Sequence, residues 1–114
     1  MNNYVTIHTD KPIYKLEEKV QIQITNTSNQ TVNFPDVGYG LEIFDKNKKI
    51  VWSLDGPEVI TPLEGGKSKT VEWNQHDRNN ERVPEGNYIA SVKYYPPQNN
   101  SLLTASTEFE IISK

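Results

Sequence analysis

The chain has 114 residues, of which 12 are basic and 15 acidic, and its formal net charge is −3. Both charge signs are interspersed without a basic stripe, which argues against a nucleic-acid-binding face. The absence of cysteine excludes a disulfide scaffold and a thiolate metal site. This length suits one domain over residues 1–114, which buries about 65% of its unfolded surface. Only 34% of the residues are hydrophobic, which favours thin alternating strands over buried helices.

Targeting signals are not visible in the sequence. The first eight residues contain no apolar region of the kind found in signal peptides. No apolar run approaches the roughly 20 residues that a membrane helix needs. We therefore expect a cytoplasmic protein without membrane insertion; the alternative is a domain cut from an extracellular or cell-surface protein.

Alternation of apolar and polar residues predicts seven to eight short strands. It is strictest over residues 18–25, where Val20, Ile22 and Ile24 point one way and polar residues the other. After the first strand, Pro12 suits a segment that crosses between two sheets, because proline cannot donate to a strand ladder. The predicted strands span residues 4–8, 18–25, 31–34, 39–45, 49–53, 67–73, 88–95 and 103–111.

The strands and turn signals together predict an all-β fold, an antiparallel Ig-like β-sandwich. The strand that ends on Trp73 is followed by a polar loop, then by Gly86 and Tyr88, as at a corner between sheets. A tyrosine at such a corner hydrogen-bonds the backbone a few residues upstream, so we expect a structural role. We expect Trp73 and Trp52 to pack between the sheets, with a ligand platform as the alternative. In the turn between the fourth and fifth strands, Asn47 is the expected carrier of a positive φ.

Residues with catalytic or metal-binding chemistry are sparse. His8 and His76 lie at no spacing typical of a metal pair, and His76 lacks nearby partners for a catalytic triad. Asp77, Asn79 and Glu81 alternate like the start of a calcium loop, but the glycine and the distant glutamate of such a loop are missing. We therefore expect no catalytic, cofactor-binding or metal-binding residues, and no enzyme.

The candidate partner-binding loop is the segment 55–62, which is bounded by prolines and carries apolar residues that the strand pattern does not need. An exposed, rigid, extended segment can join a partner's sheet or enter a protease cleft. The alternative is a crossover loop whose Val59 and Ile60 cover the core. The loop 75–81 is the second choice. The residues of the segment are Asp55, Gly56, Pro57, Glu58, Val59, Ile60, Thr61 and Pro62.

Three stretches carry a resemblance to a known family. Residues 45–52 end on Trp52, residues 63–68 contain a glycine pair, and residues 73–88 run from a tryptophan to a tyrosine. Together they resemble the bacterial intracellular proteinase inhibitor family, the BsuPI-type domain. Asn80 and either Asn47 or Lys48 stand where that family has a turn glycine, and asparagine is the best substitute because it tolerates the left-handed conformation. Gly65 stands where the family has a proline.

The resemblance implies an Ig-like sandwich and a non-enzymatic protein-binding domain that inhibits a subtilisin-type serine protease. The motif consists of structural residues, so it assigns no residue that contacts a protease. A structural or adhesive Ig-like domain of an exported or cell-surface protein is the alternative function.

Overall fold

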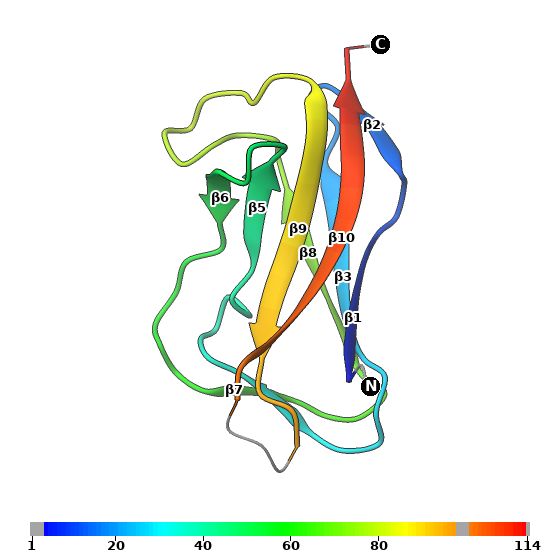
Figure 1. Cartoon of the computed structure of the whole chain (residues 1–114), viewed down its shortest axis with the longest axis vertical. Coiled ribbons are helices and arrows are strands. Elements are labelled where there is room, and N and C mark those ends of the chain that lie inside the picture. The colour runs from blue at the N-terminus through cyan, green and yellow to red at the C-terminus, as the bar shows by residue number, and fades with distance from the viewer. Residues whose placement is uncertain (1–3, 98–100, 114) are drawn as a thin grey trace.

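The chain forms a sandwich of strands, seen in a computed structural model that describes residues 4–97 and 101–113 (Figure 1). Within these residues there are ten strands and no helix, which confirms the predicted all-β sandwich. The strands are β1 Val5–Thr9, β2 Ile13–Lys15, β3 Val20–Asn26, β4 Val32–Phe34, β5 Glu42–Asp45, β6 Ile50–Ser53, β7 Thr61–Leu63, β8 Ser68–Trp73, β9 Gly86–Tyr94 and β10 Leu103–Ile112. The sequence predicted eight at most because β2 and β7 are short and lie next to or contain a proline, which favours a crossing or irregular segment.

Two sheets face each other, and a short pair closes the lower end in Figure 1. One sheet has the order β1-β3-β8, the other β2-β10-β9-β5-β6, and β4 pairs with β7. All these pairings are antiparallel except that of β2 with β10. Because β1 and β2 belong to different sheets, the chain crosses between the sheets next to Pro12, as predicted. None of the residues described here lies in a helix that could cross a membrane.

The core follows the predicted alternation. Val20, Ile22 and Ile24 of β3 are fully buried, and Val20 pairs with Trp73 of the neighbouring strand β8. Each second residue of β9 from Tyr88 to Tyr94 is buried as well. Burial of one face of each sheet is what a period of two residues produces.

An aromatic cluster joins the two sheets. The ring of Trp73 lies 6.0 Å from that of Trp52, 6.1 Å from that of Tyr88 and 6.2 Å from that of Phe109. The Trp73 indole donates a hydrogen bond to the His76 carbonyl (2.9 Å). Both tryptophans therefore pack between the sheets, as expected, and the buried indole has the partner that its N–H requires.

Tyr88 forms the predicted corner contact. Its hydroxyl donates to the Pro84 carbonyl at 2.5 Å, and the side chain is 2% exposed. Burial, and to a smaller extent the charge of Asp45, raise the pKa of Tyr88. Folding therefore favours the neutral, protonated form of the Tyr88 side chain.

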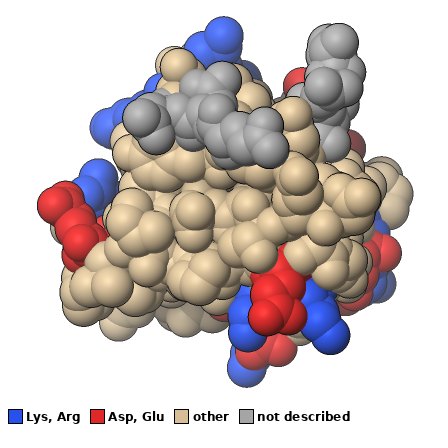
Figure 2. Space-filling view, turned by 90° about the horizontal axis from the view of Figure 1, so that it is seen from below, with Lys and Arg blue, Asp and Glu red and all other residues tan. Residues whose placement is uncertain are grey.

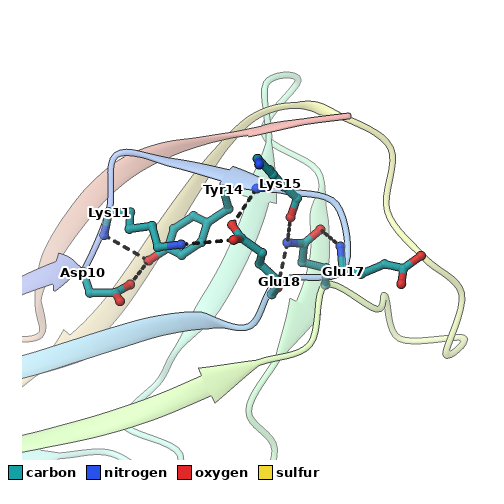
Figure 3. A network of polar contacts seen from close by, with 7 residues as sticks. Asp10, Lys11, Tyr14, Lys15, Glu17 and Glu18 are labelled. Carbon is teal, nitrogen blue, oxygen red and sulfur yellow. Dashed lines mark hydrogen bonds and ion pairs between the residues drawn. The ribbon is translucent and has the colours of Figure 1, made fainter. Parts of the chain in front are cut away.

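The crossing between β1 and β2 is held by polar contacts, shown in Figure 3. Tyr14 is fully buried, and its hydroxyl donates to the Asp10 carboxylate and accepts from the Lys11 N–H. Burial and the bond to Asp10 raise the pKa of Tyr14. The Glu18 carboxylate accepts from the Lys15 N–H (2.8 Å), and this bond lowers the pKa of Glu18. The crossing is therefore a fixed part of the fold.

Three turns share one geometry, each headed by an aspartate. The carboxylate oxygen of the aspartate accepts the N–H groups two and four residues ahead, and the residue three ahead has a positive φ. The heads are Asp36, Asp45 and Asp77, and the residues with positive φ are Tyr39, Lys48 and Asn80. The prediction of a positive φ at Asn47 is therefore wrong. In a type I turn followed by a bulge, the left-handed residue comes after the two central ones, which is Lys48.

Candidate functional site

The segment 55–62 leaves β6 and runs along one flank of the sandwich to its lower end (Figure 1). Residues 55–60 are irregular, as predicted, but Thr61 and Pro62 belong to β7 and pair with Phe34 and Asn33. A proline fits there because β7 is an edge strand.

The apolar residues of the segment point away from the core. Val59 is 56% exposed and Ile60 is 55% exposed. The alternative in which these two side chains cover the core is therefore wrong. Two neighbouring apolar side chains on the surface are a feature of contact sites when they belong to a larger patch.

Hydrogen bonds fix the segment to the sandwich at both ends. Near its start, Ser53 Oγ donates to Asp55 Oδ1 (2.8 Å) and the Val37 N–H donates to the Pro57 carbonyl (3.3 Å). At its end, Thr61 and Pro62 pair with β4, and within the segment Thr61 Oγ1 donates to the Val59 carbonyl (2.9 Å). A Cβ at residue 56 would lie 2.3 Å from Val37 Cγ2, so a larger residue than Gly56 would displace the Val37 side chain. The segment is exposed but anchored.

Two grooves flank the segment. Ile60 lines an open groove of about 1060 Å³ at the lower end, and residues 55, 56 and 58 line a second groove of about 440 Å³ with Arg78 and Lys93. Figure 2 looks onto the lower end, where the face is mostly uncharged and the Lys, Arg, Asp and Glu side chains lie toward its margin. The apolar pair therefore borders a surface with little charge.

The lining of the larger groove is polar but nearly uncharged. Its side chains include the amides of Asn29, Gln30 and Asn33, the ring of Tyr95 and one carboxylate, Glu64. These groups can hydrogen-bond a peptide backbone or other neutral polar groups. Sequence reasoning missed this groove because its walls come from three distant parts of the chain.

Asn26 helps to bring two of these walls together. Its buried amide donates to the carbonyls of Gln30 (2.7 Å) and Leu63 (2.8 Å). The turn after β3 is thus bonded to the strand β7. The sequence placed Asn26 in the turn after the predicted strand 18–25 and gave no sign of the contact with β7.

The second candidate, the loop 75–81, starts with a buried residue. Gln75 is fully buried, and its amide donates to the carbonyls of Lys15 and Glu18, both at 2.8 Å. Its side-chain oxygen accepts the Glu17 N–H at 3.3 Å. Figure 3 shows how closely Lys15, Glu17 and Glu18 gather around these bonds. Gln75 therefore ties the loop to the turn before β3, a role that the sequence did not reveal.

The remainder of that loop forms a turn that is held by hydrogen bonds within the loop. Asp77 accepts the N–H groups of Asn79 and Glu81, and the Arg78 N–H donates to the Val51 carbonyl (3.0 Å). The residues that resembled a calcium loop thus act as turn formers. In the described parts of the chain, no group of three or more His, Asp or Glu residues could hold a metal ion.

The two histidines lie in separate parts of the fold, His8 on β1 and His76 in the loop 75–81. His8 is exposed on β1, and the His76 ring nitrogen Nδ1 lies 3.2 Å from the Asn80 side-chain oxygen. The contact with an amide holds the imidazole in the turn. It does not provide the carboxylate and nucleophile that a triad requires.

Comparison with models of known protein families gives no match. The serine protease pet autotransporter of Escherichia coli O44:H18 (strain 042 / EAEC) is similar, with 35% identity over 78 residues. The match covers 62% of this chain but 6% of the autotransporter. The chain therefore spans only a small part of that protein's length.

Proposed function

We propose that the chain is a non-enzymatic protein-binding domain that contacts its partner through the segment 55–62. The observation that carries the proposal is the exposure of Val59 and Ile60 on a segment bonded to the sandwich at both ends. Apolar side chains held in place by their own protein lose little entropy on binding. Pro57 and Pro62 add to this, because each fixes its φ near −65°.

For the class of partner we propose a subtilisin-type serine protease. The supporting observation is the BsuPI-type resemblance of residues 45–52, 63–68 and 73–88. A peptide enters a protease cleft as an accessible segment, and residues 55–60 are accessible and lie outside any strand, with one tight turn in which the Val59 N–H donates to the Pro57 carbonyl (2.9 Å). The inhibitor would bind with Val59 and Ile60 in the cleft and resist cleavage because its ends are anchored.

A titration of subtilisin with the purified chain tests this proposal. Substrate turnover should fall at a micromolar excess of the chain. The double variant Val59→Ser, Ile60→Ser should lose inhibition at least tenfold, because it removes both contact side chains. Ile13→Ser is the matched control, since Ile13 is also exposed (47%) but lies on β2, and it should inhibit normally.

Two results would contradict the proposal. One is undiminished turnover at every concentration of the chain. The other is rapid cleavage within residues 55–62, which would make the segment a substrate. Equal inhibition by the double variant would place the contact elsewhere, with the loop 75–81 as the next region to test.

A second candidate is a structural or adhesive domain of an exported or cell-surface protein. The observation in its favour is the similarity to a small part of the long autotransporter. Fractionation of the source cells, with an antibody against the chain, separates the two candidates. Recovery from the cell envelope or medium, without inhibition of subtilisin, would favour the second; recovery from the cytoplasm would favour the first.

A further inference from the structure

Among residues 4–97 and 101–113, the strand β10 has a free edge along its lower half. Its partner on that side, β2, has three residues, which pair with residues 110–112 (Figure 1). The Glu110 N–H donates to the Pro12 carbonyl (3.0 Å), and the Leu16 N–H donates to the Ile112 carbonyl (2.9 Å). Backbone groups alternate sides along a strand, so the even-numbered residues of β10 face this edge. Thr104, Ser106 and Glu108 therefore direct N–H and C=O groups toward an unpaired side.

A groove runs beside this free edge. It has a volume of about 440 Å³ and is lined by residues 5–8 of β1 and 104–107 of β10. The two strands belong to different sheets and are not paired with each other. Higher on β10 the inward positions hold buried Phe109 and Ile111, whereas lower down they hold the smaller, half-buried Ala105 and Thr107. The smaller side chains leave the space that forms the groove.

Two other outer edges of the sheets, those of β6 and β8, carry features that hinder strand pairing. The edge of β6 is contacted by the 75–81 loop, whose Arg78 N–H donates to Val51. The edge strand β8 carries an exposed lysine, Lys69, on the face that it shares with Trp73. Inward-pointing charges, covering loops and prolines are the usual means of blocking an edge. Residues 103–108 of β10 contain no lysine and no proline.

We propose that this edge of β10 binds an extended segment of a partner protein, which adds a strand in line with β2. The added strand pairs with residues 104–108 and directs small apolar side chains into the groove beside Val5 and Ile7. Its outward side chains are neutral or basic, because Glu108 and Glu110 lie on the outer face of β10. This surface lies on the opposite flank from the segment 55–62 (Figure 1), so it does not depend on the proposed inhibitor function.

A flexible segment fits this edge better than a second copy of the chain. The edge is recessed, because β1 forms the other wall of the same groove. A second folded copy would present its own β10 with its own β1 beside it. Two recessed edges meet less easily than one recessed edge and a single extended strand.

The first test uses a peptide of alternating character, acetyl-Thr-Val-Lys-Val-Thr-Val-Lys-amide, added to the full chain. Hydrogen exchange of the amides of Thr104, Ser106 and Glu108 should slow at least tenfold at saturation. The same peptide with an N-methyl group on every residue keeps its side chains but loses the backbone donors along both edges. It should give no protection, because strand addition depends on main-chain hydrogen bonds.

Two proline variants make the test specific to this edge. Ser106→Pro removes the central N–H of the free edge and should weaken peptide binding at least tenfold. Thr70→Pro is the control on β8. The Asn26 N–H donates to the Lys67 carbonyl, so the alternation directs the Thr70 N–H outward as well. That variant should bind the peptide normally. Ala105→Leu, which fills the groove without changing the backbone, should also weaken binding and covers the case in which Ser106→Pro fails to fold.

Three results would overturn the proposal. The first is no protection of β10 at millimolar peptide. The second is protection confined to β6, β8 or the Val5 and Ile7 amides, which would place the strand elsewhere. The third is protection of Ser106 that appears without peptide and rises with protein concentration alongside a dimer in sedimentation, which would make a second copy the occupant.

Discussion

The segment 55–62 and the loop 75–81 were both candidate contact regions, and they differ at the residues next to the sandwich. The segment 55–62 exposes two apolar side chains, Val59 and Ile60, by more than half. The loop 75–81 is polar in sequence, yet it starts with the fully buried Gln75. The comparison teaches that one polar residue of a connecting loop can be buried where nearby backbone groups need hydrogen-bond partners, while the rest of the loop stays exposed.

That requirement explains the difference between the two regions. At the upper end, the turn before β3 directs the carbonyls of Lys15 and Glu18 toward the buried amide of Gln75, which donates to both. At the lower end, β4 and β7 pair with each other and Asn26 bonds the adjoining turn. The segment 55–62 is therefore free to direct Val59 and Ile60 outward, where they can contact a partner.

The variant with the largest expected effect removes Trp73, whose indole donates a hydrogen bond to the loop 75–81. Trp73→Ala should lower the free energy of unfolding by about 3–5 kcal/mol, the usual range for a buried aromatic residue. The variant loses the contacts with Trp52, Tyr88 and Phe109 and the hydrogen bond to the His76 carbonyl. Urea unfolding followed by circular dichroism measures the change. A loss below 1 kcal/mol would mean that the upper loop does not depend on this anchor.

Gln75→Leu tests the hydrogen bonds that connect the loop 75–81 to the turn before β3. It keeps a side chain of similar size but removes the hydrogen bonds to the Lys15 and Glu18 carbonyls and to the Glu17 N–H, and only the Lys15 carbonyl keeps a second donor, the Glu18 N–H. A loss of about 1–3 kcal/mol is expected, the usual cost of polar groups left unsatisfied. Gln23→Leu, at an exposed position of β3, is the control and should change stability little. Equal effects of the two variants would contradict the role assigned to Gln75.

Tyr88→Phe probes the corner that follows the upper loop. Loss of the bond to the Pro84 carbonyl should cost about 1 kcal/mol at neutral pH. Because burial raises the pKa of Tyr88, the unfolded chain releases this proton first as the pH increases. The stability that Tyr88 contributes is therefore complete below about pH 10 and is lost as the pH rises through the higher folded pKa.

Unfolding experiments at several alkaline pH values measure this effect. The free energy of unfolding of the wild type should fall more steeply above about pH 10 than that of Tyr88→Phe. Tyr14→Phe is a useful comparison, because the pKa of Tyr14 is raised in the same direction. Identical slopes for the wild type and both variants would show that neither phenol titrates differently in the folded chain.

The sequence predicted the sandwich because its longer strands alternate strictly, as in β3 and β9. It also predicted the Tyr88 corner and the crossing at Pro12, since both depend on local residue types. The sequence did not predict contacts between distant parts of the chain. Gln75 bonds residues about sixty positions away, and nothing in a polar loop marks one amide as buried. The groove beside Ile60 and the free edge of β10 likewise exist only once the strands are arranged.

The smallest expected effect on stability belongs to the double variant Val59→Ser, Ile60→Ser. Both side chains are more than half exposed, so their removal should change the free energy of unfolding by less than about 0.5 kcal/mol. The same urea experiment used for Trp73→Ala measures it, with Ile13→Ser as a matched exposed control. A loss above 1 kcal/mol would show that the two side chains pack against the sandwich, and the contrast between the two loops would fail. An unchanged stability, together with lost inhibition of subtilisin, would assign the two residues to binding alone, because surface side chains that stabilise nothing in their own fold are free to serve a partner.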